Sequence, residues 1–148
     1  APALSADQAS VADSVRLALT GDAGQRVLMA WHLGWDPAWQ ASGKAWIAPV
    51  LAQLLDDPYA AVRCVAERSL RRLAPALVPA DYDYTLSPEQ RPPVRDAVFA
   101  RWLQDSRAAR VGNQPGATRV RPDNPGATQE DFARLRGQRD DRAVRLRE

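Results

Sequence analysis

Few residues of this 148-residue chain have side chains suited to catalysis or metal binding. His32 and Cys64 are its single histidine and single cysteine, so no internal disulfide, Cys/His zinc cluster or Cys-x-x-Cys-His haem-attachment motif can form. Asp81 and Asp83 could pair as catalytic carboxylates or bind calcium, but no glycine-spaced calcium loop surrounds them, which favours a solvated loop. We therefore predict a protein that is not an enzyme, with no catalytic residues, no metal site and no cofactor in this chain.

Tryptophan and arginine are the remaining candidates, and both residue types are used in binding. Trp31, Trp35, Trp39 and Trp46 lie close together in the sequence and could form an aromatic binding surface. Packing between two helix pairs is the alternative that we favour for these four side chains. His32 could be an axial haem ligand to a neighbouring domain, although a histidine beside a tryptophan is more often a packed or rim residue.

The first third of the chain predicts two helices. Ser5 with Gln8 three residues later is typical of a helix start, because each side chain can bond the other's backbone amide. Gly21 should end this helix in the left-handed conformation, and Asp22 should cap the next one. Asp36-Pro37 should stop the second helix, and a short connector should follow from Trp35 to Lys44.

The stretch from Ala45 to Leu73 predicts a pair of antiparallel helices. Each carries an apolar stripe at helical spacing, formed by Trp46, Ile47, Val50, Leu51, Leu54 and Leu55 in the first and by Val62, Val65, Ala66, Ser69, Leu70 and Leu73 in the second. Pro49 falls in the first turn, where it is tolerated. We expect Asp57 to cap the second helix and Arg63 to stay at the rim of the pair.

The last half of the chain predicts one long helix and a tail. Residues 81–84 should form an ordered loop whose tyrosines pack on the helices, and Pro92-Pro93 should open a fifth main helix. From residue 107 onward arginine, glycine and proline dominate, with ten arginines against six acidic residues and a repeated Pro-Gly turn motif in 113–118 and 123–128. We expect a domain over residues 1–106 and an extended tail over 107–148, with a docking helix over 129–136 anchored by Phe132 and Leu135.

The run from Trp46 to Leu70 resembles a HEAT repeat. In that family an aspartate and a proline lie between two antiparallel helices and a valine-arginine pair begins the second helix, as Asp57-Pro58 and Val62-Arg63 do here. Residues 5–35 resemble a degenerate second copy without the aspartate-proline turn. The resemblance implies an all-α fold of short HEAT-like helical repeats with about five main helices.

A second resemblance covers most of the chain. The stretches 19–26, 41–43, 54–63, 69–73 and 139–142 are similar to the C-terminal HEAT-containing region of bacterial multihaem c-type cytochromes. In that family the haem-bearing part lies upstream, and this chain has none of the attachment motifs, so electron transfer by the chain itself is not implied. The resemblance implies an exported protein, periplasmic or extracellular, in a larger assembly whose upstream or partner domain would carry haem c.

Composition is consistent with this location. The chain begins at Ala1 rather than at methionine, as expected for a mature exported protein or a piece of a longer one. Its apolar runs are only a few residues long, against the roughly 20 needed to cross a bilayer, so we predict no membrane span.

We therefore expect a non-enzymatic scaffold or protein-interaction domain that is part of, or associated with, an exported multihaem c-type cytochrome. Helical repeats commonly bind a partner on an extended face. Its partner would be the haem-bearing domain or copies of itself, bound through Arg63, Arg68, Arg72, Trp35 and Trp39. The alternative is a HEAT-like nucleic-acid-binding module with an arginine-rich face. It is less favoured because acidic residues alternate with the arginines and Lys44 is the only lysine.

Overall fold

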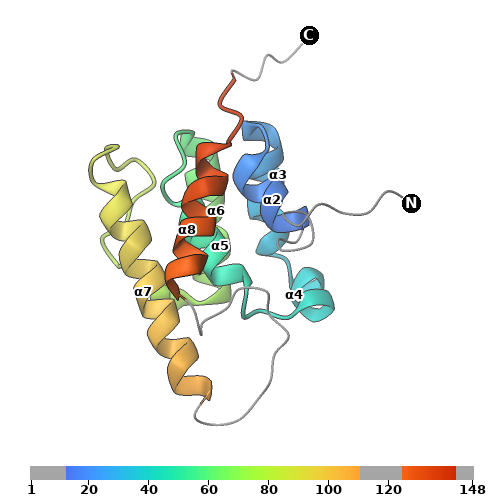
Figure 1. Ribbon diagram of the computed structural model, residues 1–148, viewed down its shortest axis with the longest axis vertical. Helices are drawn as coiled ribbons and strands as arrows, with labels where there is room; N and C mark the ends of the chain where they lie inside the picture. Colours follow the sequence, from blue (N-terminus) through green and yellow to red (C-terminus); the bar gives the residue numbers. More distant parts are fainter. Residues whose placement is uncertain (1–12, 111–124, 143–148) are drawn as a thin grey trace.

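The computed structural model describes residues 13–110 and 125–142, and this part of the chain is all-α, without strands (Figure 1). Its elements are α2 (Asp13–Thr20), α3 (Ala23–Leu33), α4 (Asp36–Ser42), α5 (Ile47–Leu54), α6 (Ala60–Leu73), the short 3-10 helix η1 (Pro75–Leu77), α7 (Arg91–Arg110) and α8 (Pro125–Gly137). None of the described helices is long and apolar enough to cross a membrane.

Helix α5 lies at the centre of the fold. All eight of its residues are buried, and it packs against α2, α3, α6 and α7. Pro49 lies in its first turn, as the sequence predicts. Because each of its faces contacts another helix, this short segment needs the nearly continuous apolar composition that it has.

The pairing of α5 with α6 confirms the expected match of two apolar stripes. Val50, Leu51 and Leu54 on α5 and Val62 and Leu70 on α6 are buried in a single core. The outer face of α6 carries an ion pair between Arg71 and Glu67, whose nitrogen and oxygen lie 3.0 Å apart. The helix pair is therefore built as its 3.6-residue periodicity predicts.

The turn between α2 and α3 follows the prediction in part. Asp22 caps α3 and forms a reciprocal capping box with Gln25. Gly21, however, does not have a positive φ angle, which among the described glycines only Gly43 has. A side chain at Gly21 would bring its Cβ to 2.6 Å from the carbonyl oxygen of Leu17, so this position requires glycine for space and not for its φ angle.

The segment from Trp35 to Lys44 is not the predicted connector. Asp36-Pro37 does follow the end of α3, but the same two residues begin α4, in which Pro37 occupies the first turn. A proline that cannot continue one helix is well placed to start the next, because its φ angle is helical and the amide it lacks would be unpaired there. The predicted helix start at Ser5 and the Pro-Gly motif of 113–118 lie outside the described residues.

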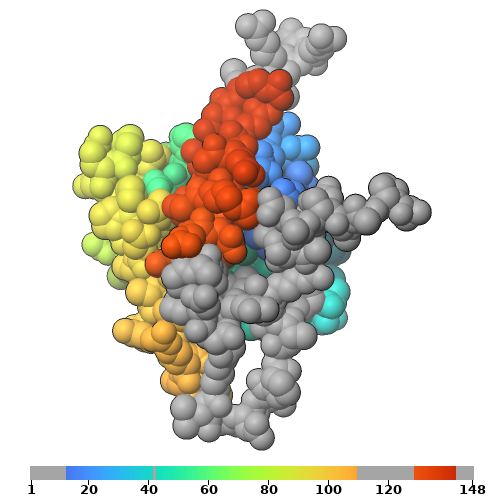
Figure 2. All heavy atoms as spheres, in the orientation of Figure 1, coloured from blue at the N-terminus to red at the C-terminus, as the bar shows by residue number. Residues whose placement is uncertain are grey.

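The C-terminal half places a long helix and a docking helix on the core. Helix α7 begins at Arg91, one residue before the expected start, and continues to Arg110, beyond the expected boundary at residue 106. Helix α8 begins at Pro125, so the second Pro-Gly motif opens a helix. Phe132 and Leu135 are buried as predicted, and Phe132 packs edge-on against Phe99 of α7 with ring centres 6.2 Å apart. Figure 2 shows α8 in red between α7 and the N-terminal helices.

Truncation of Leu70 should test this core. Leu70 is completely buried on α6, so Leu70→Ala should lower the free energy of unfolding by about 2 to 5 kcal/mol through lost apolar burial and the cavity left behind. Leu28→Ala, at a leucine that is 66% exposed, is the matched control and should change stability by less than about 0.5 kcal/mol. Urea unfolding followed by far-ultraviolet circular dichroism measures both, and equal losses would contradict the described core.

Candidate functional site

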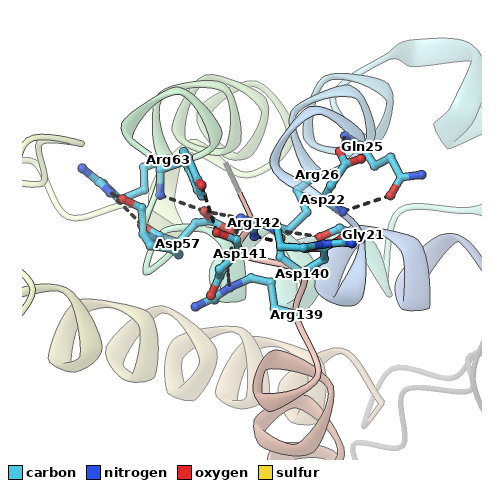
Figure 3. A network of polar contacts seen from close by, with 12 residues as sticks. Gly21, Asp22, Gln25, Arg26, Asp57, Arg63, Arg139, Asp140, Asp141 and Arg142 are labelled. Atoms are coloured by element: carbon cyan, nitrogen blue, oxygen red, sulfur yellow. Dashed lines mark hydrogen bonds and ion pairs between the residues drawn. The ribbon is translucent and has the colours of Figure 1, made fainter. Parts of the chain in front are cut away.

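A buried ion pair joins α3 to the α5–α6 turn (Figure 3). Arg26, on the inner face of α3, donates from Nε to Asp57 Oδ2 at 2.7 Å and from Nη2 to Asp57 Oδ1 at 3.2 Å. The two side chains are 0% and 1% exposed. A bidentate pair of this kind is both strong and specific in geometry, so it fixes how α3 sits on the turn.

The C-terminal segment closes over the same arginine. Arg26 Nη1 donates to the carbonyl oxygens of Gly21, at 2.6 Å, and Asp140, at 2.8 Å, and its Nη2 lies 3.3 Å from Asp141 Oδ1. The backbone amide of Asp140 donates to the carbonyl oxygen of Thr20 at 3.1 Å. Residues that follow α8 are thus bonded directly to the α2–α3 turn.

Two further arginines bond the backbone of the α5–α6 turn. Arg63 donates to the carbonyl oxygens of Asp57, at 2.6 Å, and Pro58, at 2.9 Å, and also to that of Tyr84, at 2.6 Å. Arg91, at the start of α7, donates to the carbonyl oxygen of Asp57 at 3.1 Å. Burial lowers the pKa of Arg63, which the nearby Arg91 lowers further.

The predicted positions of Arg63 and Asp57 are therefore wrong. Arg63 is 6% exposed and not at the rim, because three carbonyl oxygens bind its guanidinium inside the structure. Asp57 does not cap α6, whose cap residue is Tyr59. Asp57 Oδ1 instead accepts a hydrogen bond from the backbone amide of Tyr59 at 2.9 Å, and the same carboxylate pairs with Arg26.

The C-terminal segment carries two close charge pairs. Arg139 pairs with Asp141 at 2.8 Å and Arg142 with Asp140 at 2.7 Å. Hydrogen bonds from the side chain and backbone of Arg142 lower the pKa of Asp140 to about 2. The Asp140–Arg142 pair therefore stays charged across the physiological pH range.

The network has the properties of a set of contacts that stabilises the fold. Its charged groups are bonded to one another or to backbone carbonyls, and its central members are inaccessible to solvent. Within the described ranges no three His, Cys, Asp or Glu side chains are grouped as a metal site would require. Cys64, which is only partly exposed, is a free thiol on α6. The candidate binding residues accordingly lie elsewhere, on the outer side of α3 and α4.

Two tryptophans are stacked on the outside of the molecule. Trp31 is 58% and Trp35 45% exposed, and their ring centres lie 5.9 Å apart with the planes at 21°. The ring of the exposed His32 lies 6.0 Å from that of Trp35, and Leu28 is one helical turn before Trp31. The favoured prediction that the tryptophans pack in the core is wrong for Trp31 and Trp35. We call Leu28, Trp31, His32 and Trp35 the tryptophan surface.

Cations and a third tryptophan border this surface. The Trp39 ring is half-buried, and its Nε1 donates to the carbonyl oxygen of Leu33 at 2.7 Å. Lys44 Nζ lies 4.6 Å and Arg72 Cζ 5.7 Å from the ring centre, and Arg72 also pairs with Asp36 at 3.1 Å. Arg68 is exposed one helical turn before Arg72.

No protein-family model, curated protein or solved structure matches this chain.

Of the five predicted partner-binding residues, the structure brings four to one region. Trp35 precedes the first residue of α4, and Trp39 lies within that helix. Arg72 contacts Trp39, and Arg68 lies on the same exposed side of α6 as Arg72. Arg63 lies in the buried network instead, so we remove it from the partner-binding set.

Sequence reasoning missed the key residue of the network, Arg26. A signal for it was present, because Arg26 lies three residues after Ala23 and four before Ala30, on the stripe of α3 that is buried. An arginine on an apolar stripe indicates a buried cation that requires an acidic partner, and Asp57 is that partner.

Breaking this pair from one side should destabilise the fold strongly. Asp57→Asn keeps the shape of the side chain but leaves the buried Arg26 with only the half-exposed Asp141 as an acidic partner, so we expect a loss of about 3 to 5 kcal/mol in unfolding free energy. Asp105→Asn, which breaks an ion pair to Arg101 between two largely exposed side chains, is the control and should cost less than about 1 kcal/mol. Urea denaturation gives both values, and similar stability of the two variants would refute the structural role.

Proposed function

We propose that this chain is a non-catalytic protein-interaction module that binds a protein partner through the tryptophan surface. The observation that carries this proposal is the stacked, solvent-exposed pair Trp31 and Trp35 beside the exposed Leu28. Large aromatic side chains dominate the energetics of protein interfaces, since they bury much area at little loss of conformational entropy. Grouped exposed apolar residues are typical of interaction sites.

Helix α3, which carries Leu28 and Trp31, packs closely on α6. Ser69 of α6 donates from Oγ to the carbonyl oxygen of Ala30 at 2.7 Å. A Cβ at Gly34 would lie 2.3 Å from that same hydroxyl oxygen, so the end of α3 and α6 approach each other as closely as glycine allows. A surface fixed in this way loses little freedom on binding, which favours affinity.

The charges at the border favour a partner with acidic groups around an apolar centre. Lys44 lies over Trp39 and Arg68 is exposed nearby, while Arg72 beside the same ring is paired with Asp36, and the tryptophan surface itself has no acidic member. Opposite charges at an interface rim speed association and select orientation more than they add affinity.

A HEAT-like arrangement is part of the proposal. The pairs α2–α3 and α5–α6 pack on each other through contacts of α3 with α6 and of α2 with α5, as stacked helical repeats would. In this arrangement the tryptophan surface belongs to the first pair, and the aspartate-proline turn belongs to the second.

The partner that we propose is the haem-bearing portion of an exported multihaem c-type cytochrome, in the periplasm or outside the cell. Support for this narrower proposal comes from the resemblance of the sequence stretches described above. Haem c would then belong to the partner. Because His32 lies in the tryptophan surface, it would face the partner in such a complex, and a role as haem ligand in trans is a hypothesis of the same proposal.

Nucleic-acid binding is the weaker alternative. Of the arginines of α6, Arg63 is buried, Arg71 pairs with Glu67, and Arg72 pairs with Asp36. Arginines that are already paired contribute less to the release of counterions that drives binding to phosphates.

Removing the two tryptophans should abolish tight binding. Trp31→Ala combined with Trp35→Ala should weaken affinity for the haem-bearing cytochrome domain by at least about 30-fold, because each removes a candidate anchor worth about 2 kcal/mol. Tyr84→Ala is the matched control, since Tyr84 is also an exposed aromatic residue and only its backbone is used by Arg63. Calorimetric titration measures the affinity, and circular dichroism checks folding.

Two outcomes would contradict this proposal. Equal affinity of the double variant and the Tyr84→Ala control would exclude the tryptophan surface as the binding site. Absence of binding to the cytochrome domain, together with concentration-dependent self-association in sedimentation that the double variant lacks, would replace the haem-bearing partner with a second copy of this chain.

A salt titration with a fluorescent DNA duplex tests the alternative. We expect no binding tighter than about 1 μM near 0.15 M salt, because Arg63, Arg71 and Arg72 of α6 are buried or already paired with acidic side chains. Submicromolar affinity that falls steeply as salt rises would favour the nucleic-acid module over the protein-interaction module.

A further inference from the structure

A pocket with basic walls lies where the end of α8 meets the start of α7 and the α5–α6 turn. Its volume is about 420 Å³, within the range of small-molecule sites. Three arginines line it, Arg91, Arg136 and Arg139, against the single acidic lining residue Asp56. The rest of the described lining is Pro58, Pro88, Pro92 and Gly137. We call this site the basic pocket.

The arginines of the basic pocket are incompletely neutralised. Asp56 is bound most closely by Arg95, whose Nη1 lies 2.6 Å from Asp56 Oδ2, whereas Arg91 Nε remains 3.7 Å from Oδ1. Arg91 is nine-tenths buried, and its Nε has no hydrogen-bond partner. Arg136 bonds the neutral side-chain oxygen of Gln53.

Electrostatics of the surrounding groups are consistent with an excess of positive charge. Burial lowers the pKa of Arg136, and the neighbouring Arg95 and Arg139 lower it further. Burial raises the pKa of Asp56, although Arg95, Arg91, Arg136 and Arg139 all act in the opposite direction. Asp56 therefore lies among four guanidinium groups, of which Arg95 also pairs with Asp96 and Arg139 with Asp141.

We propose that the basic pocket binds the phosphate group of a small soluble phosphate ester. A guanidinium group presents several donors in a plane that matches the oxygens of phosphate, and the buried Nε of Arg91 is a donor without an acceptor. A dianion suits a pocket with three arginines and one aspartate better than a monoanionic carboxylate does. The site shares no residue with the tryptophan surface, so it is independent of the proposed protein partner.

Calorimetric titration with inorganic phosphate, in chloride buffer of constant ionic strength, tests this site. We expect saturable one-to-one binding that acetate does not reproduce. Arg136→Gln should weaken phosphate binding by about 10-fold or more, since hydrogen bonds to charged groups are worth about 1.5 to 3 kcal/mol, and Arg101→Gln on the exposed part of α7 should not. If Arg136→Gln does not fold, Arg139→Gln replaces it with the same expected direction.

Two aspartates of the same region give a matched comparison. Asp56→Asn removes the only acidic lining residue and should strengthen phosphate binding, whereas Asp96→Asn removes an exposed partner of Arg95 outside the pocket and should have less effect. The Trp31→Ala, Trp35→Ala double variant should bind phosphate normally. Absence of phosphate binding, equal binding of acetate, or no response to Arg136→Gln and Asp56→Asn would each overturn the proposal.

Discussion

Arg26 and Asp57 place two opposite charges where water cannot reach them, and the surrounding structure is arranged to compensate for that burial. Removing both ions from water costs several kcal/mol each, and their attraction offsets this only with good geometry and further hydrogen bonds. Those bonds come from Gly21, Asp140 and the amide of Tyr59. The α2–α3 turn, the α5–α6 turn and the C-terminal segment must consequently all be in place together. Arg63 and Arg91 extend the same constraint to the loop of residue 84 and to α7, because both donate to the carbonyl oxygen of Asp57.

This constraint determines which face of α3 is available for binding. Arg26, Ala30 and Leu33 are directed into the core, and Gly34 packs on Ser69, so the helix cannot rotate about its axis. The opposite side of the helix therefore presents Leu28 and Trp31 to solvent, and Trp35, two residues after the end of α3, stacks on Trp31. Arg26 and Trp31 lie on opposite faces of α3, so the packing of the buried face fixes the position of the exposed face.

Local features of this fold could be predicted from sequence, whereas the network could not. The stripes of α5 and α6, the Asp22 capping box and the burial of Phe132 and Leu135 depend on residues within a few positions of one another. Arg26 bonds partners 31 and 114 positions away, and no periodicity reveals such distances. Hydropathy assigned Arg63 to the rim, but it is buried because backbone carbonyl oxygens accept its hydrogen bonds. Hydropathy also assigned the tryptophans to the core, but Trp31 and Trp35 are exposed to solvent. For the candidate site, the sequence indicated that tryptophans and arginines are the relevant residues, but it did not indicate which of them are buried and which are exposed.

Three of the five stretches that carry the resemblance to the cytochrome region meet in this same network. Gly21 and Arg26 come from 19–26, Asp57 and Arg63 from 54–63, and Asp140 from 139–142, and all are bonded around one buried ion pair (Figure 3). Such a pattern is explained by the requirements of folding. Under the proposed function, binding depends on residues that the network leaves unused. Trp31 and Trp35 can be replaced without breaking a buried bond, whereas Arg26 and Asp57 cannot, so a module of this design can change its partner while keeping its fold.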